Sequence, residues 1–151
     1  MNEGSTSKFS GTALFDDGTI AVLSGSNLSW SVLSGPIVSI NADGVATTDL
    51  VYADTAATAR GSYRAAAGTL TLTVLDSNPD NFGSYAGDGL PDSWQVQYFG
   101  QNNSEAGPTV DADGTGQNNL FKYVAAWTQP IPPLCSCCRF KTCSVSPTRR
   151  I

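Results

Sequence analysis

An acidic, glycine-rich segment between residues 111 and 122 constrains this chain more than any other stretch. Asp111, Asp113 and Thr115 alternate along it, and Gly116 follows directly. This spacing is close to the pattern of a calcium-binding loop. In such loops the side chains at positions 1, 3 and 5 point inward, and a glycine at position 6 allows the bend. The sequence therefore predicts a loop folded around calcium, with Asp111, Asp113 and Thr115 as side-chain ligands.

The second half of this segment departs from the pattern at its last position. The carbonyl group of Gln117 falls at position 7 and Asn119 at position 9, where ligands are usual. Position 12, which normally carries a bidentate Glu, is Lys122. A cationic side chain cannot ligate calcium, so we expect weak affinity. A glycine-rich acidic turn that binds nothing is the alternative interpretation.

Composition excludes several other kinds of site. The 151 residues include no His, which removes His general bases, Ser-His-Asp and Cys-His systems and His-ligated zinc. The net charge of −5 does not favour a nucleic-acid partner. No apolar run reaches the length of about 18 residues that a membrane span requires. We therefore expect a protein that is not an enzyme, does not bind nucleic acid and does not span a membrane.

Residues 8–75 have the pattern of a mainly β fold. Short runs rich in Val, Ile, Leu and Thr are separated there by Gly, Asn, Asp and Ser, the spacing expected of a β-sandwich. The side chains of Leu28, Trp30 and Val32 fall on one face, which we expect to be core. The strands expected from the pattern are Lys8–Phe15, Thr19–Leu23, Leu28–Val32, Ile37–Ile40, Val45–Thr47, Thr55–Ala65 and Thr69–Leu75.

These runs resemble the bacterial immunoglobulin-like domain, group 2. The resemblance is carried by a Trp-containing strand (Leu28-Ser-Trp30-Ser), a hairpin around Asp43-Gly44 and a closing Thr-rich strand from Thr69 to Val74. It implies an immunoglobulin-like sandwich that serves as a spacer or adhesion module in large surface proteins. It implies no catalytic residues.

Residues 84–127 have a different, helical pattern. Pro91 and Asp92 suit the beginning of a helix, and Gly100 is a plausible end. A second helix is expected at about Asn118–Trp127. We expect aromatic side chains to pack between the two helices. The apolar side chains expected on one stripe of the second helix are Leu120, Tyr123, Val124 and Trp127.

This second region resembles the extracellular loop–helix calcium modules that include dockerins and thrombospondin type 3 repeats. The motifs are Asp-Gly-Leu-Pro-Asp-x-Trp, from Asp88, and Asp-x-Asp-Gly-x-Gly, from Asp111. The resemblance implies a first half-site in which Asp88 and Asp92 are ligands at positions 5 and 9. Its remaining positions are Ser84, Ala86 and Gln95, and the second half-site has Asp111, Asp113, Thr115 and Asn119. Because both halves depart from the pattern, we expect one calcium rather than two.

Residues 128–151 differ in composition from the rest. Residues 1–130 carry a charge of −9, whereas residues 131–151 carry +4. Four cysteines occur here, but their spacing fits no common zinc finger. Disulfides are possible in an oxidising compartment. We expect a disordered or non-native tail. The cysteines are Cys135, Cys137, Cys138 and Cys143.

Together these patterns predict a non-catalytic module of a larger secreted or cell-surface protein. The expected order is an immunoglobulin-like β-sandwich (8–75), a two-helix calcium-loop module (84–127) and an unstructured tail (128–151). Calcium is expected to act structurally and to bind weakly. The expected partner is a protein or polysaccharide at the cell surface. A dockerin-like interaction module and an accessory domain of a secreted hydrolase are the alternatives. The chain begins without a secretory signal pattern, so an extracellular location implies that it is part of a longer chain.

Overall fold

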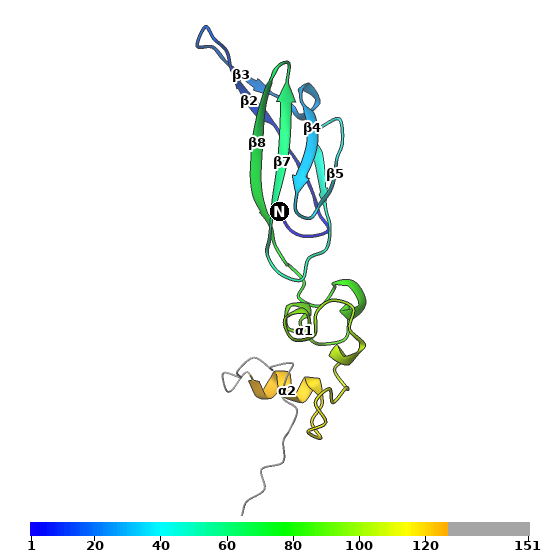
Figure 1. The fold of residues 1–151 in the computed structure, drawn as a ribbon. Helices are drawn as coiled ribbons and strands as arrows, with labels where there is room; N and C mark the ends of the chain where they lie inside the picture. The colour runs from blue at the N-terminus through cyan, green and yellow to red at the C-terminus, as the bar shows by residue number, and fades with distance from the viewer. Residues whose placement is uncertain (127–151) are drawn as a thin grey trace, which may run out of the picture.

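The structure is a computed structural model that describes residues 1–126. The described part is mainly β, with three small antiparallel sheets and two short helices. The strands occupy one end of the molecule, and the helices follow at the other end (Figure 1). The expectations for Trp127 and for the Cys-containing segment 128–151 lie outside the described residues.

The elements follow one another in chain order with short connections. The strands are β1 (Thr6–Lys8), β2 (Gly11–Leu14), β3 (Ile20–Leu23), β4 (Ser29–Ser34), β5 (Ile37–Ile40), β6 (Val45–Thr48), β7 (Thr55–Tyr63) and β8 (Ala66–Val74). The helices are α1 (Asp92–Phe99) and α2 (Asn119–Ala126), with short 3-10 turns η1 (Gly25–Asn27), η2 (Gly83–Tyr85) and η3 (Ser104–Ala106).

Two three-stranded sheets and one hairpin make up the β region, which we define as residues 1–75. The sheets have the strand orders β1-β6-β5 and β4-β7-β8, and β2 pairs with β3. The longest pairing joins β7 to β8, from Thr55 opposite Val74 to Tyr63 opposite Ala66. The first residues of the chain contact the end of this hairpin, where the Glu3 N–H donates to the Leu75 carbonyl oxygen at 3.0 Å.

The core of the β region draws its residues from both three-stranded sheets. Ala57 and Ala59 of β7 and Ala46 of β6 are fully buried, together with the larger Val74 and Ile37. Small side chains at these positions let the two sheets approach closely. Burial of apolar surface at this core is the main favourable contribution to folding of the β region.

Two details of the β region differ from the sequence-based expectation. The run Lys8–Phe15 is interrupted, because Phe9 leaves the pairing with β6 and buries its ring 5.7 Å from that of Trp30. The chain then starts a separate hairpin. Val32 was expected in the core but is 36% exposed. Val32 is still paired with Ala59, and the register of β4 against β7 shifts directly after it.

The helical region, residues 83–126, confirms the two expected helices. The predicted end of α1 at Gly100 is confirmed, with φ of +78° and an N–H that donates to the Val96 carbonyl oxygen at 3.0 Å. The side chains that α1 buries completely are polar, namely Asp92 and Gln95. This buried polar face is unusual, because Asp and Gln side chains are mostly exposed in folded proteins.

Candidate functional site

Asp80 organises the turn that precedes α1. Its Oδ1 accepts hydrogen bonds from the N–H groups of Gly87 (2.7 Å) and Asp88 (3.1 Å), and its Oδ2 accepts one from Gly89 N–H (2.9 Å). The first carboxylate of a tightly bent loop can fix the bend in this way, by accepting several backbone N–H groups. In the sequence, Ser84 stands at position 1 of this half-site, but the structure gives the loop-closing role to Asp80.

Asp88 connects the same turn to the buried face of α1. Its Oδ1 accepts the N–H of Leu90 at 2.9 Å, and its Oδ2 accepts Gln95 Nε2 at 2.7 Å. Gln95 Nε2 also donates to the carbonyl oxygen of Ala106 at 3.0 Å. The Gln95 amide is therefore oriented by two acceptors, which leaves its Oε1 atom directed elsewhere.

Asp92 is fully buried at the first turn of α1. Its Oδ2 accepts the N–H groups of Asn81 (2.6 Å) and Phe82 (2.7 Å). Burial raises the pKa of this carboxyl group, and the charges of Asp80 and Asp88 raise it further, although the two backbone hydrogen bonds act in the opposite direction. A buried carboxylate in such a position needs a compensating positive charge or a proton.

Four buried side-chain oxygens accept no hydrogen bond from any residue of the described part of the chain. We call them the unpartnered oxygens; they are Asp76 Oδ1, Asn81 Oδ1, Asp92 Oδ1 and Gln95 Oε1. Buried polar atoms normally have partners, so exceptions such as these indicate a ligand or water. Carboxylate and amide oxygens are what calcium prefers in proteins. Among residues 1–126 no three Asp, Glu, His or Cys side chains group closely enough to hold a metal ion. A site here therefore depends on amide and backbone oxygens as well.

The second acidic loop brings three of its predicted ligands together. Asp111 Oδ2 accepts Gly116 N–H at 2.6 Å, and both Asp111 Oδ1 and Asp113 Oδ1 accept Thr115 N–H at 3.2 Å. The Thr115 hydroxyl group donates to Asp113 Oδ1 at 2.8 Å. The predicted bend is present. It uses hydrogen bonds within the loop to hold the two carboxylates in place.

Lys122 turns back into this loop and pairs with both carboxylates. Its Nζ atom lies 3.1 Å from Asp111 Oδ1 and also donates to Asp113 Oδ1. The hydrogen bond from Lys122 lowers the pKa of Asp113 strongly. Burial lowers the pKa of Lys122, but its hydrogen bonds to Asp113 and Asp111 outweigh this and leave the pKa raised. The ammonium group thus supplies the positive charge that the acidic loop requires.

The other two predicted ligands of this loop are placed differently. Asn119 is 1% exposed and donates its Nδ2 atom to the carbonyl oxygens of Glu105 (2.7 Å) and Gly107 (2.9 Å). These bonds attach the start of α2 to the segment around η3. The side chain of Gln117 is exposed. This does not bear on the prediction, which named only the Gln117 carbonyl group as a ligand.

Sequence reasoning missed Asp80 because it lies eight positions before Asp88, whereas the loop pattern places its first ligand four positions before. The intervening residues form η2 and a turn at Gly87, which has a φ of +78°. These additional residues bend back at η2 and Gly87, so the Asp80 carboxylate still contacts the turn at residues 87–89. An acidic residue ahead of a glycine-containing insertion is the signal that could have identified it.

Aromatic packing joins the two helices, as expected. The ring of Trp94 lies 5.7 Å from that of Tyr123 on α2 and 5.2 Å from that of Tyr98 on α1. Trp94 follows Asp92 by two residues, so its environment reports on this part of α1.

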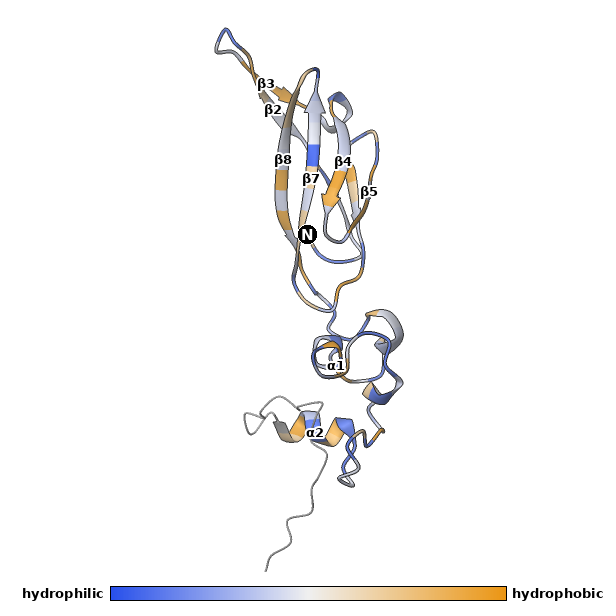
Figure 2. Ribbon diagram, in the orientation of Figure 1, coloured by the Kyte–Doolittle hydropathy of each residue, from blue (hydrophilic) through white to orange (hydrophobic). Residues whose placement is uncertain are grey.

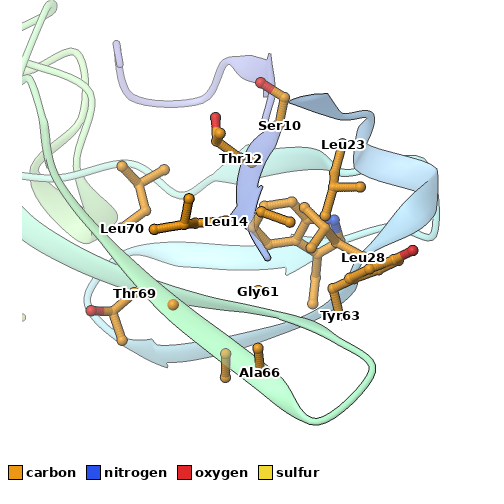
Figure 3. A pocket seen from close by; sticks show the side chains of 15 residues that line it. Ser10, Thr12, Leu14, Leu23, Leu28, Gly61, Tyr63, Ala66, Thr69 and Leu70 are labelled. Atoms are coloured by element: carbon orange, nitrogen blue, oxygen red, sulfur yellow. The ribbon is translucent and has the colours of Figure 1, made fainter. Parts of the chain in front are cut away.

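A groove of about 390 Å³ opens at the far end of the β region, between the β2–β3 hairpin and β8. Figure 3 shows its mainly apolar wall, including Leu14, Leu28 and Leu70. The hairpin itself is strongly apolar on β3 (Figure 2), and Ile20 and Val22 are 69% and 81% exposed. Exposed apolar surface of this kind is typical of contact surfaces.

No protein-family model, curated protein or solved structure matches this chain. Within the described residues, none of the helices is both long and apolar enough to pass through a membrane. The functional interpretation therefore depends on the chemistry of the two loops.

Proposed function

We propose that this chain is a non-catalytic module of a larger secreted or cell-surface protein. In this proposal the β region is an immunoglobulin-like spacer or adhesion domain, and the first acidic loop, residues 80–95, binds one structural calcium ion. The observation that carries the calcium proposal is the pair of unpartnered oxygens on one face of α1, Asp92 Oδ1 and Gln95 Oε1. The two residues are three positions apart, so their side chains are neighbours on the helix.

The two loops differ in what balances their negative charge. In the second loop, Asp111 and Asp113 are paired with Lys122. In the first loop, Asp80 and Asp88 satisfy backbone N–H groups, but no described Lys or Arg pairs with them or with Asp92. A divalent cation at the first loop would supply the missing charge and use the unpartnered oxygens. We therefore assign the single expected calcium to the first loop.

Weak calcium binding fits a protein outside cells. Extracellular calcium modules bind at about 10⁻⁴–10⁻³ M, which suits the calcium concentration there. The proposed role is structural, because the ion would offset repulsion among buried carboxylates and fix the turn against α1. The absence of His from the sequence also favours a non-catalytic role.

The proposal is tested by titrating the chelator-treated chain with calcium chloride and recording tryptophan fluorescence. Because Trp94 follows Asp92 closely, we expect a saturable change at about 10⁻⁴–10⁻³ M calcium. Magnesium should produce a weaker response, because it demands octahedral geometry and loses its water reluctantly. A flat response to calcium, confirmed by calorimetry, would refute the calcium proposal.

A second candidate function is a dockerin-like interaction module. It is favoured by the apolar side chains that α2 leaves exposed among the described residues, Leu120 (42%), Phe121 (53%) and Val124 (58%). A partner protein could cover this stripe. Replacing Phe121 and Val124 with Ser should abolish partner capture without changing calcium affinity, which would separate this function from the structural one.

A further inference from the structure

The joint between the β region and α1 contains two unpartnered oxygens, those of Asp76 and Asn81, that precede the fixed-spacing pattern of residues 84–95. We propose that Asp76 and Asn81 coordinate the same cation as Asp92, so that calcium fastens the β region to the helical region. This inference rests on the proposed function, because it assumes that the first loop binds calcium. It assigns two additional ligands that lie outside the loop pattern.

Glu3 holds the segment after β8 in place and so defines the joint. Its Oε1 atom accepts the N–H groups of Ser77 (3.0 Å) and Asn78 (2.8 Å), and its Oε2 atom accepts Val51 N–H at 3.0 Å. The side chain is 7% exposed. The linker that leaves the β region is therefore attached to the N-terminus by buried, charge-assisted hydrogen bonds.

Asn81 lies between Glu3 and Asp92 and contacts both. Its Nδ2 atom donates to Glu3 Oε1 at 3.2 Å, and its backbone N–H donates to Asp92 Oδ2 at 2.6 Å. The bond to Glu3 orients the Asn81 side-chain amide, and the backbone bond holds this residue beside Asp92. Its Oδ1 atom is buried and meets no donor from the described residues, as is also true of Asp92 Oδ1.

Asp76 completes the set from the β region, as the second residue after β8. Its backbone N–H donates to Asp54 Oδ1 at 2.9 Å, which anchors the residue, while its own Oδ1 atom is one of the unpartnered oxygens. Burial raises the pKa of Asp76, and the charges of Glu3, Asp92 and Asp54 raise it further. The charge of Asp92 therefore acts on Asp76, which agrees with their location at one joint.

The charges of three carboxylates, Glu3, Asp54 and Asp92, thus act on the fourth, Asp76. The ion pairs of the described chain all involve Lys122, which is in the second loop, so no Lys or Arg offsets this charge among residues 1–126. Three unpartnered oxygens, from Asp76, Asn81 and Asp92, remain beside these charges. All three are hard oxygen donors, which suits calcium rather than a softer metal such as zinc.

The experiment compares two variants of the full chain that lose the same charge, Asp76→Asn and Asp54→Asn, in calorimetric titrations with calcium chloride. Asp54 donates no ligand in this proposal, and an Asn at that position can still accept the Asp76 N–H. We expect Asp76→Asn to weaken calcium binding about tenfold, because calcium affinity follows the number of charged ligands. Asp54→Asn should weaken it by less than about threefold, through the nearby charge alone.

Hydrogen exchange of the unmodified chain provides a second measurement that does not depend on the variants folding. Calcium should slow amide exchange in residues 76–79 as well as in the first loop, residues 80–95. Equal weakening by the two Asn variants, or slower exchange confined to residues 80–95, would overturn the joint proposal while leaving the calcium-loop proposal standing. If the unmodified chain binds no calcium at all, the proposed function fails and the joint proposal fails with it.

Discussion

Lys122 Nζ lies 3.1 Å from Asp111 Oδ1, in the position where the loop pattern expects a Glu that would help to bind calcium. The replacement of the expected Glu by Lys122 therefore has a structural consequence: the ammonium group of Lys122 occupies the loop as its positive charge. The two acidic loops differ in what balances their negative charge among the described residues. The second uses Lys122, and we propose that the first uses calcium.

Replacing Lys122 tests whether its charge takes the place of calcium in the second loop. In Lys122→Glu the ammonium group is lost and the missing twelfth ligand is restored, so we expect the chain to bind two calcium ions instead of one. Lys122→Met, which removes only the charge, should lower the melting temperature in chelator, because Asp111 and Asp113 would then repel each other. Calorimetry and thermal denaturation measure the two effects. A stoichiometry that stays at one in Lys122→Glu would show that the second loop is only a turn.

The lowered pKa of Glu3 predicts how the free energy of unfolding depends on pH. Burial raises the pKa of Glu3, but hydrogen bonds from Val51, Asn78, Asn81 and Ser77 outweigh this and leave the pKa below its ordinary value. An acid with a lowered pKa stabilises the folded state above its unfolded pKa, near 4.3, and this contribution is lost as the pH falls through the folded value. We expect Glu3→Gln to cost about 2 kcal/mol at pH 7.

The matching measurement is urea unfolding of both proteins in chelator between pH 7 and pH 3. The difference in free energy of unfolding between the original chain and Glu3→Gln should shrink as the pH decreases. A difference that stays constant over this range would mean that the charge of Glu3 is not what stabilises the joint.

We expect a substitution of Gly44, in the turn between β5 and β6, to destabilise the fold. Its φ is +76°, and a Cβ atom there would lie 2.6 Å from the Cα atom of Gly25. Gly44→Ala should therefore cost about 2 kcal/mol or more, from backbone strain together with the clash. Gly18→Ala is the matched control, because Gly18 has a φ of +81° but open space around it. Equal losses of stability in the two variants would show that the close approach to Gly25 contributes nothing.

Local patterns in the sequence predicted most of the strands and both helices, because alternation, turn glycines and a helix-ending Gly100 act over a few residues. They did not predict β1 or the break in pairing at Phe9. They did not predict where Lys122 would point, since a long side chain can extend into solvent or fold back. They also missed Asp80 and Asp76, whose importance depends on an irregular linker that brings them to α1. Patterns of fixed spacing cannot describe residues that such a linker brings into place.

The buried polar face of α1 shows the same limit. Leu90, Trp94 and Tyr98 recur every four residues, and Leu90 is fully buried. Asp92 and Gln95 are buried as well, although their residue types predict exposure. Their burial is possible because the N–H groups of Asn81 and Phe82 donate to Asp92. Gln95 in turn donates to Asp88 and to the carbonyl oxygen of Ala106.

The most direct test of the central claim is a calorimetric titration of the full chain with calcium, repeated with Asp80→Asn and Asp111→Asn. Each variant removes one charge from a loop-closing carboxylate, one in each loop. We predict one calcium per chain, binding weakened at least about tenfold by Asp80→Asn and nearly unchanged binding in Asp111→Asn. Binding that is lost in Asp111→Asn and retained in Asp80→Asn would contradict the assignment of calcium to the first loop.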